Sequence, residues 1–183
     1  MGDPKKQRKK YETPRHPWRK ERIDRDKLIL KEFGLKNRRE ILKMEHILRR
    51  FRKQAKNLKA LDTEQSKKEQ KQLITKLTKL SLLNKDSSLD DVLALSLDSI
   101  LNRRLQTLLV KKGLAKTVSQ SRQFVTHGHI SINNKKITSP SYIVPIEEES
   151  LITFRPSSKL SNSEHPERVI KEKIEKIKKK VEE

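Results

Sequence analysis

Apolar residues recur at spacings of three and four between Asn37 and Leu61. The residues in this pattern are Ile41, Met44, Leu48, Phe51, Ala55 and Leu58. The spacing places them on one face of a helix. The other faces hold many arginines and lysines but few acids. An ordinary solvent-exposed helix gains ion pairs between residues i and i+4, and this one lacks the acids to form most of them. We predict a long helix whose basic surface contacts phosphates; a coiled-coil seam is the alternative, but the repeat is short.

Two shorter helical patterns follow. Leu73, Leu77 and Leu80 share a face in residues 66–80, which predicts a second helix. After a break at residues 84–88, Ser88 and Asp91 have the spacing of a capping box. The pattern therefore predicts a small helical domain over residues 23–95.

A third apolar stripe leads into the most ordered part of the sequence. It is made by Leu97, Ile100, Leu101, Leu105, Leu108 and Leu109. As one helix, this stripe leaves Arg103, Arg104 and Lys111 near its edges or on its outer face. Gly113 suits the left-handed residue that ends such a helix.

A second helix is expected after this turn, followed by a small sheet. Thr117 and Gln120 match a capping box, and Gly128 suits the helix end. The adjacent asparagines at 133 and 134 tolerate the positive φ of a two-residue hairpin turn. That turn sets Ile130 opposite Ile137 and Ser131 opposite Lys136, and further short strands are expected at 142–144 and 151–154. The predicted fold class is α+β.

The charge composition indicates the class of partner that the chain binds. The 183 residues carry a net charge of +21, and charged residues make up 38% of the chain against 32% hydrophobic. Such self-repulsion favours a polyanionic partner. The sequence has no apolar run of the ~20 residues needed to span a bilayer, no apparent signal peptide and no cysteine. We expect a cytoplasmic nucleic-acid-binding protein without disulfides, cofactors or a small-molecule substrate.

The charge is concentrated near the N-terminus. Residues 1–60 carry 22 Lys and Arg against 8 Asp and Glu. Residues 1–22, with prolines at 4, 14 and 17, are predicted to be an extended arm that is disordered when free and becomes ordered on RNA. A solubilising tail is the alternative. Trp18 is expected to pin the arm onto its own domain, with stacking on a base as the alternative.

A longer string identifies the ordered region. Residues 103–144 read RRLQTLLVKKGLAKTVSQSRQFVTHGHISINNKKITSPSYIV and closely resemble the S4 RNA-binding fold. The opening GDPKKQRKKYETPRHPW and the late HPER resemble the archaeal form of the ribosomal protein S4 family. The resemblance implies binding to the 5′ domain of 16S ribosomal RNA, assembly of the small-subunit body, and contact with ribosomal protein S5 and other small-subunit proteins. The resemblance also implies that the protein contributes to translational accuracy together with S5.

The charge pattern and the resemblance together divide the chain and indicate its RNA-binding residues; those between residues 103 and 129 come from the resemblance, and the others from the charge pattern. The expected parts are a basic arm (1–22), a helical rRNA-binding domain (23–95), an S4-type domain (96–160) and a basic C-terminal tail (161–183). The candidate RNA-binding residues are Arg103, Arg104, Lys111, Lys112, Thr117, Ser119, Arg122, Gln123, His127, His129, Arg49, Arg50, Lys53, Lys9 and Lys10. Arginine forks and helix N-termini suit phosphates. For Arg104 the alternative is a cap on its own domain, and for Arg122 an exposed side chain without a partner.

Other chemistries fit the sequence poorly. His127 and His129 lack further ligands and cysteines nearby, so no metal site is expected. Residues 147–149, all glutamate, are expected in a solvated turn facing away from RNA. With four glycines and no catalytic motif, no catalytic residue is expected and the chain is not predicted to be an enzyme. The alternative function is the RNA-recognition module of an RNA-modifying or tRNA-acting system.

Overall fold

The computed structural model describes residues 2, 9–61, 63–84, 86–162, 165 and 167. They form two compact units, one within residues 1–78 and 82–101 and the other within 79–81 and 102–183. The division falls inside the predicted apolar stripe of residues 97–109. The helical pattern expected at 170–181 lies outside the described residues. No helix among the described residues is long and apolar enough to cross a membrane.

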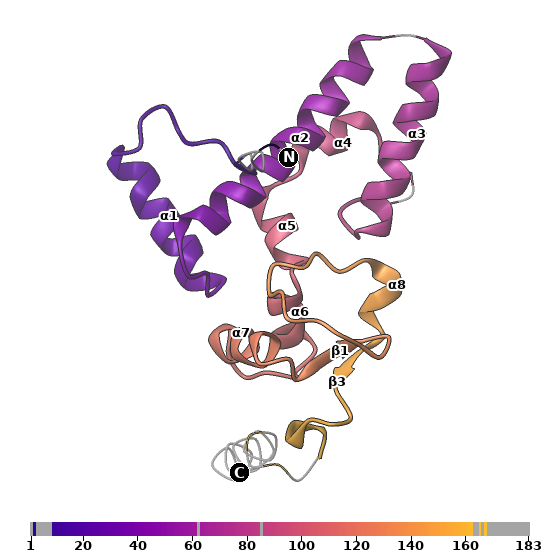
Figure 1. Cartoon of the computed structure of the whole chain (residues 1–183). Helices are drawn as coiled ribbons and strands as arrows, with labels where there is room; N and C mark the ends of the chain where they lie inside the picture. Colours follow the sequence, from indigo (N-terminus) through magenta and orange to yellow (C-terminus); the bar gives the residue numbers. More distant parts are fainter. Residues whose placement is uncertain are drawn as a thin grey trace, which may run out of the picture. The chain divides into compact units, whose positions relative to one another are not determined.

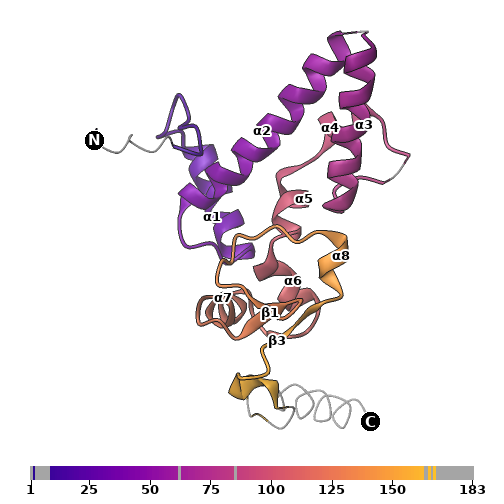
Figure 2. The same ribbon diagram turned by 45° about the vertical axis from the view of Figure 1, so that its right-hand side comes forward.

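The first unit is helical. It contains α1 (Lys20–Glu32), α2 (Arg38–Ala60), α3 (Glu64–Lys79), α4 (Leu89–Ala94) and most of α5 (Leu97–Asn102). Figures 1 and 2 show α4 between α2 and α3. The long helix and its packing stripe are confirmed, because five of the six predicted stripe residues are buried.

The short helix α4 begins as its sequence predicts. The carboxylate of Asp91 accepts a hydrogen bond from the backbone N–H of Ser88 at 2.7 Å, so the predicted capping interaction is confirmed. Val92 on this helix is fully buried, as are Ile41 of α2 and Leu77 of α3. Burying such side chains stabilises a unit by ~1.5–3 kcal/mol each relative to exposure.

Helix α1 was not predicted from the sequence. Its buried residue is the acid Asp26 rather than a row of apolar residues. Asp26 Oδ2 accepts hydrogen bonds from Arg38 Nε and Nη2 at 3.1 and 2.9 Å. Arg22 and Arg25 both pair with Glu45 of α2, at 2.8 and 3.0 Å. Ion pairs thus hold α1 against α2, a role that a stripe of buried apolar residues has in most helices.

The second unit packs helices against a small sheet. It contains α6 (Leu105–Lys111), α7 (Val118–Thr126), β1 (Ile130–Ile132), β2 (Lys135–Lys136), α8 (Ile146–Glu149), β3 (Ile152–Phe154) and the 3₁₀ turn η1 (Lys159–Ser161). The antiparallel strands have the order β2-β1-β3. Leucines of α6, Phe124 and Val125 of α7 and the isoleucines of β1 and β3 share one core. The predicted α+β class is confirmed.

The turns of this unit follow their sequence signals. Gly113 and Gly128 have φ of 71° and 75°, the left-handed values expected after α6 and α7. Asn133 and Asn134 have φ of 48° and 60°. Their turn gives the predicted pairing of Ser131 with Lys136. The hairpin is therefore confirmed in register as well as in place.

Two local predictions are wrong. The stripe of residues 97–109 is not one helix, because Arg104 has extended φ and ψ of −69° and 141° and separates α5 from α6. Residues 142–144 form no strand; only Ile143 makes an isolated bridge, to Arg104. Both differences have one cause, since the backbones of Arg103 and Arg104 turn away from the helix to pair with this segment, with Val144 N–H donating to Arg103 O at 3.0 Å.

Candidate RNA-binding surfaces

The first candidate surface lies where α6 ends and α7 begins. Gly113 turns the chain between them, and Leu114 N–H donates to Leu109 O at 2.9 Å to close the turn. Lys111 and Lys112 at the end of α6 are exposed, as are Thr117 and Ser119 at the start of α7. The turn thus brings two lysines and a helix N-terminus into one short stretch of chain.

The start of α7 is capped as predicted, with one difference. Thr117 Oγ1 accepts a hydrogen bond from Gln120 N–H at 3.2 Å. Gln120 Oε1, however, accepts from the N–H of Lys116 at 2.8 Å rather than from that of Thr117. The first N–H groups of a helix have no intrahelical partners, and together with the helix dipole they favour an anion.

An anion of the chain itself lies at this position. Glu167 accepts a hydrogen bond from Gln120 Nε2 at 2.7 Å, and its carboxylate is 3.8 Å from Lys116 Nζ. Glu167 belongs to the HPER string, whose function the sequence did not indicate. The contact shows that the side chains of Gln120 and Lys116, near the start of α7, take a carboxylate as their partner.

The remaining candidates on α7 differ in exposure. Gln123 and His127 are exposed, whereas Arg122 and His129 are partly buried. His129 Nδ1 lies 2.8 Å from Ser158 Oγ, and its ring stacks on that of His127 with centroids 6.2 Å apart. Burial, and secondarily the neighbouring His127, lower the pKa of His129. A neutral His129 is therefore favoured, which suits a structural contact better than a phosphate contact.

Arg103 and Arg104 do not lie on an outer face, which corrects the sequence-based placement. Arg103 is 9% exposed and Arg104 1%. Arg103 donates to Glu149 at 2.7 Å and to the carbonyl oxygen of Val144 at 2.9 Å. The alternative considered for Arg104, an internal structural role, fits its burial and its bridge to Ile143. The apolar spacing gave no sign of this, because it assumed an unbroken helix.

The acidic residues 147–149 are also more than a solvated turn. They lie in the short helix α8, where Glu149 pairs with Arg103 and Glu148 accepts a hydrogen bond from the Tyr142 hydroxyl at 2.7 Å. That bond, with burial and the charge of Glu148, raises the pKa of Tyr142 to about 12. Lys112 also donates to the backbone oxygen of Glu149. Two of these glutamates thus hold their own unit together.

Two further exposed lysines, which the sequence reasoning did not single out, lie on the hairpin. Lys135 and Lys136 of the hairpin are exposed. Lys136 crosses Gly128 so closely that a Cβ on the glycine would lie 2.1 Å from Lys136 Cε. This contact places a lysine beside the C-terminal end of α7. The sequence could have predicted that these two lysines are exposed, because a two-residue turn between β-strands presents its flanking side chains at the edge of the sheet.

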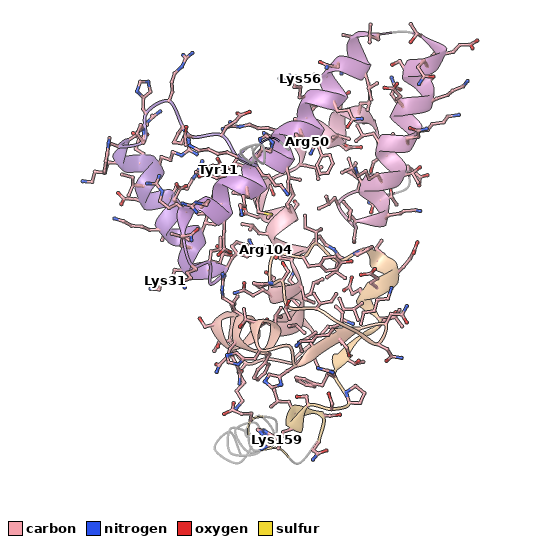
Figure 3. All side chains as sticks on the ribbon, in the orientation of Figure 1. Tyr11, Lys31, Arg50, Lys56, Arg104 and Lys159 are labelled. Atoms are coloured by element: carbon pink, nitrogen blue, oxygen red, sulfur yellow. The ribbon has the colours of Figure 1, made fainter. Side chains whose placement is uncertain are left out.

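The second candidate surface is the basic side of α2 with the N-terminal arm. Arg49, Arg50 and Lys53 are exposed, and so are Lys9 and Lys10. Figure 3 shows Arg50 and Lys56 along α2. Arg49 Nη1 donates to Glu12 Oε2 of the arm at 2.6 Å, so part of its charge is already used within the chain.

Neither surface resembles a catalytic or metal centre. Among the residues that the structure describes, no three His, Cys, Asp or Glu side chains come together in a group that could hold a metal ion. What both surfaces offer is lysine, arginine and backbone N–H groups, which is the chemistry that binds phosphates.

Comparison with known proteins identifies the fold and then the family. Residues 103–150 match the family model of the S4 domain, so the second unit is that of an S4-domain protein. The chain is 50% identical over 169 residues to small ribosomal subunit protein uS4 of Methanococcus aeolicus, covering 92% of this chain and 96% of that protein. It is 51% identical over 155 residues to uS4 of Saccharolobus solfataricus, covering 84% and 86%. The chain belongs to the small ribosomal subunit protein uS4 family.

Proposed function

We propose that the protein is a structural constituent of the cytoplasmic small ribosomal subunit that binds 16S rRNA directly. The observation that carries this proposal is the 50% identity to a uS4 protein over almost the full length of both chains. The proposed target is the 5′ domain of this RNA, and the proposed consequence is that the protein nucleates assembly of the subunit body. The net charge of +21 supports a polyanionic partner.

The proposed parts have distinct functions. The arm (1–22) and the helical domain (23–95) supply phosphate contacts through Lys9, Lys10 and the basic side of α2. The S4-type domain (96–160) binds through the ends of α6 and α7, and the tail (161–183) contributes seven basic residues against six acidic ones. The proposed contacts in the S4-type domain are Lys111, Lys112, Thr117, Ser119, Arg122, Gln123 and His127. Their exposed or partly exposed side chains support this assignment.

Protein partners and the absence of catalysis are part of the same proposal. We include ribosomal protein S5 among the neighbours, with a joint contribution to translational accuracy. The relatives are ribosomal proteins. On that basis we assign neither a catalytic activity nor a small-molecule substrate, and the RNA-modifying alternative has no specific observation in its favour.

A salt-dependent binding titration tests the proposal. The full chain is titrated with a transcript of the 16S rRNA 5′ domain and, separately, with an unrelated structured RNA of equal length. We expect a preference for the rRNA that persists as salt rises, because a shaped surface adds contacts that counterion release does not weaken. Equal affinities that collapse together with salt would contradict the proposal.

A further inference from the structure

The described part of the N-terminal arm is anchored at two points. Arg39 lies over the Tyr11 ring, 6.0 Å from its centroid, and Glu12 accepts a hydrogen bond from Arg49. Figure 3 shows Tyr11 where the arm meets α2. At the other end the arm enters α1, whose first turn includes a bond from Ile23 N–H to Arg19 O at 3.1 Å. Residues 13–19 therefore form a loop closed at both ends on the helical unit.

Trp18 in this loop is exposed. Its relative exposure is 87%, the largest among the exposed large hydrophobic residues of the described chain. The expectation that it pins the arm onto its own domain is therefore wrong; Tyr11 and Glu12 make the anchoring contacts instead. The face of the indole is therefore open to a stacking partner.

A pocket of about 470 Å³ opens beside this loop. Its lining residues are Pro14, Arg15, His16, Arg19, Glu21, Arg22 and Arg25. The volume falls in the range of ~300–1,000 Å³ typical of small-ligand sites, which accommodates a nucleotide. The lining has four arginines and one acid, so it favours an anion.

The arginines of the pocket are not equivalent. Arg22 and Arg25 already pair with Glu45, at 2.8 and 3.0 Å. Arg15 and His16 make no hydrogen bond or ion pair within the described residues, and Arg19 pairs only with exposed Glu21, at 2.7 Å. The side chains of Arg15 and His16 are therefore available to an incoming phosphate. Arg19 can exchange Glu21 for a phosphate at little cost in free energy, because an exposed ion pair contributes ~0–1 kcal/mol.

We propose that Trp18 stacks on an unpaired nucleobase of the ribosomal RNA while Arg15, His16 and Arg19 bind the adjacent backbone phosphate. Every base offers a face for stacking on an aromatic ring, and arginine matches the phosphate oxygens. This inference rests on the proposed function and names a contact for it. The positive lining favours RNA over a protein partner, because protein interfaces place an exposed tryptophan against a desolvated apolar pocket.

The single tryptophan allows a direct test. Fluorescence of the full chain is recorded during titration with the 16S rRNA 5′-domain transcript, with and without acrylamide as a quencher. We expect free Trp18 to be open to acrylamide, and bound Trp18 to lose fluorescence by stacking and to be protected. Binding is measured in parallel by filter retention, which does not depend on tryptophan.

Two substitutions separate stacking from simple burial. W18L should weaken binding by roughly 5- to 150-fold, the equivalent of ~1–3 kcal/mol for a stacked base. W18F keeps an aromatic face and should lose much less. Because the indole is exposed, neither change should lower the melting temperature. The salt slope should remain the same in both, whereas R15Q should reduce it by ~0.7–0.9.

The outcomes are distinguishable. If wild-type protein binds the rRNA by filter retention but fluorescence and W18L affinity do not change, the inference fails and the proposed function stands. If the wild type shows no preference for the rRNA, both fail. Protection of Trp18 that appears only when other small-subunit proteins are added would assign the site to a protein and overturn the inference. Equal losses in W18L and W18F would also overturn stacking.

Discussion

In the helical unit the buried charged side chain among the described residues is an acid, Asp26, whereas in the S4-domain unit the buried charges are Arg103 and Arg104. Asp26 is approached by Arg22, Arg25 and Arg38, so one carboxylate organises several guanidinium groups. In the other unit, Glu149 and the backbone oxygen of Val144 accept hydrogen bonds from the two terminal nitrogens of Arg103.

The difference shows how a strongly basic chain folds before it meets RNA. Some of its arginines stabilise the fold instead of binding RNA. These arginines can be identified by their contacts in the structure, but not by their positions in the sequence. In both units an acid holds buried or partly buried arginines, Asp26 and Glu45 in the first and Glu149 in the second. Substitutions at the two kinds of site should therefore separate stability from RNA affinity.

The largest effect is expected for Asp26→Ala. Removing the buried carboxylate takes away two charge-assisted hydrogen bonds from Arg38 and the ion pairs with Arg22 and Arg25, and should destabilise the helical unit by ~3–5 kcal/mol. Urea unfolding followed by circular dichroism measures the change. Asp24→Ala is the matched control, because among the described residues Asp24 makes an exposed pair with Lys27, and its loss should cost ~0–1 kcal/mol. Equal effects of the two changes would contradict the organising role of Asp26.

Arg103→Ala should produce the next largest loss, in the S4-domain unit. The change removes hydrogen bonds to Val144 O and Glu149 and should cost ~2–3 kcal/mol, because bonds to a charged group are the stronger ones. Thermal unfolding measures it, with Glu149→Gln as a milder control that keeps the arginine. The folded fraction should retain the wild-type salt slope of rRNA binding. A reduced slope would restore Arg103 as a phosphate contact.

Residues of the proposed RNA-binding surface should behave in the opposite way. Lys111→Ala and Arg122→Ala should each weaken rRNA binding by ~1–3 kcal/mol, and the melting temperature should change little for Lys111→Ala, whose side chain is exposed. Lys68→Ala on α3 removes the same charge elsewhere and is the control for a general loss of positive potential. Equal affinities for all three variants and the wild type would mean that the RNA-binding face is elsewhere.

Whether a feature of the fold could be predicted from the sequence depends on how far apart in the chain its interacting residues lie. Gly113, Gly128 and the Asn133-Asn134 turn act through their own backbone conformations, so their positions could be predicted from the sequence alone. The stripe on α2 could be predicted for the same reason, since helical periodicity is local. The S4 resemblance at residues 103–144 likewise located most of the exposed candidate residues.

What could not be predicted depends on partners far along the chain. Helix α1 is fixed by ion pairs to α2 through Asp26 and Glu45, and no periodicity records them. The break at Arg104 depends on pairing with Ile143, which lies 39 positions later in the sequence. Trp18 was misassigned because an apolar residue in a short loop gives no local sign of whether its own chain covers it.

A smaller, pH-dependent effect is expected at Tyr142. Hydrogen bonding to Glu148 raises its pKa from 10.0 to about 12, so the folded chain holds this proton more tightly than the unfolded chain. The resulting stabilisation is complete below about pH 10 and is lost as the pH rises through about 12. Tyr142→Phe should cost ~0.5–1.5 kcal/mol at neutral pH and remove this alkaline decline. Unfolding curves at neutral and alkaline pH test it; an unchanged decline in Tyr142→Phe would contradict the assignment.

The smallest effect concerns a carboxylate of the chain that lies on the proposed RNA-binding surface. Glu167 lies against Gln120 and Lys116 at the start of α7, where we propose that an RNA phosphate binds. An exposed pair of this kind is worth ~0.2–1 kcal/mol, so Glu167→Gln should tighten rRNA binding by a few-fold at most. Filter binding at low salt measures the gain, with Glu64→Gln on α3 as the control for lost negative charge. A weaker affinity in Glu167→Gln would mean that this carboxylate positions Gln120 for RNA instead of competing with it.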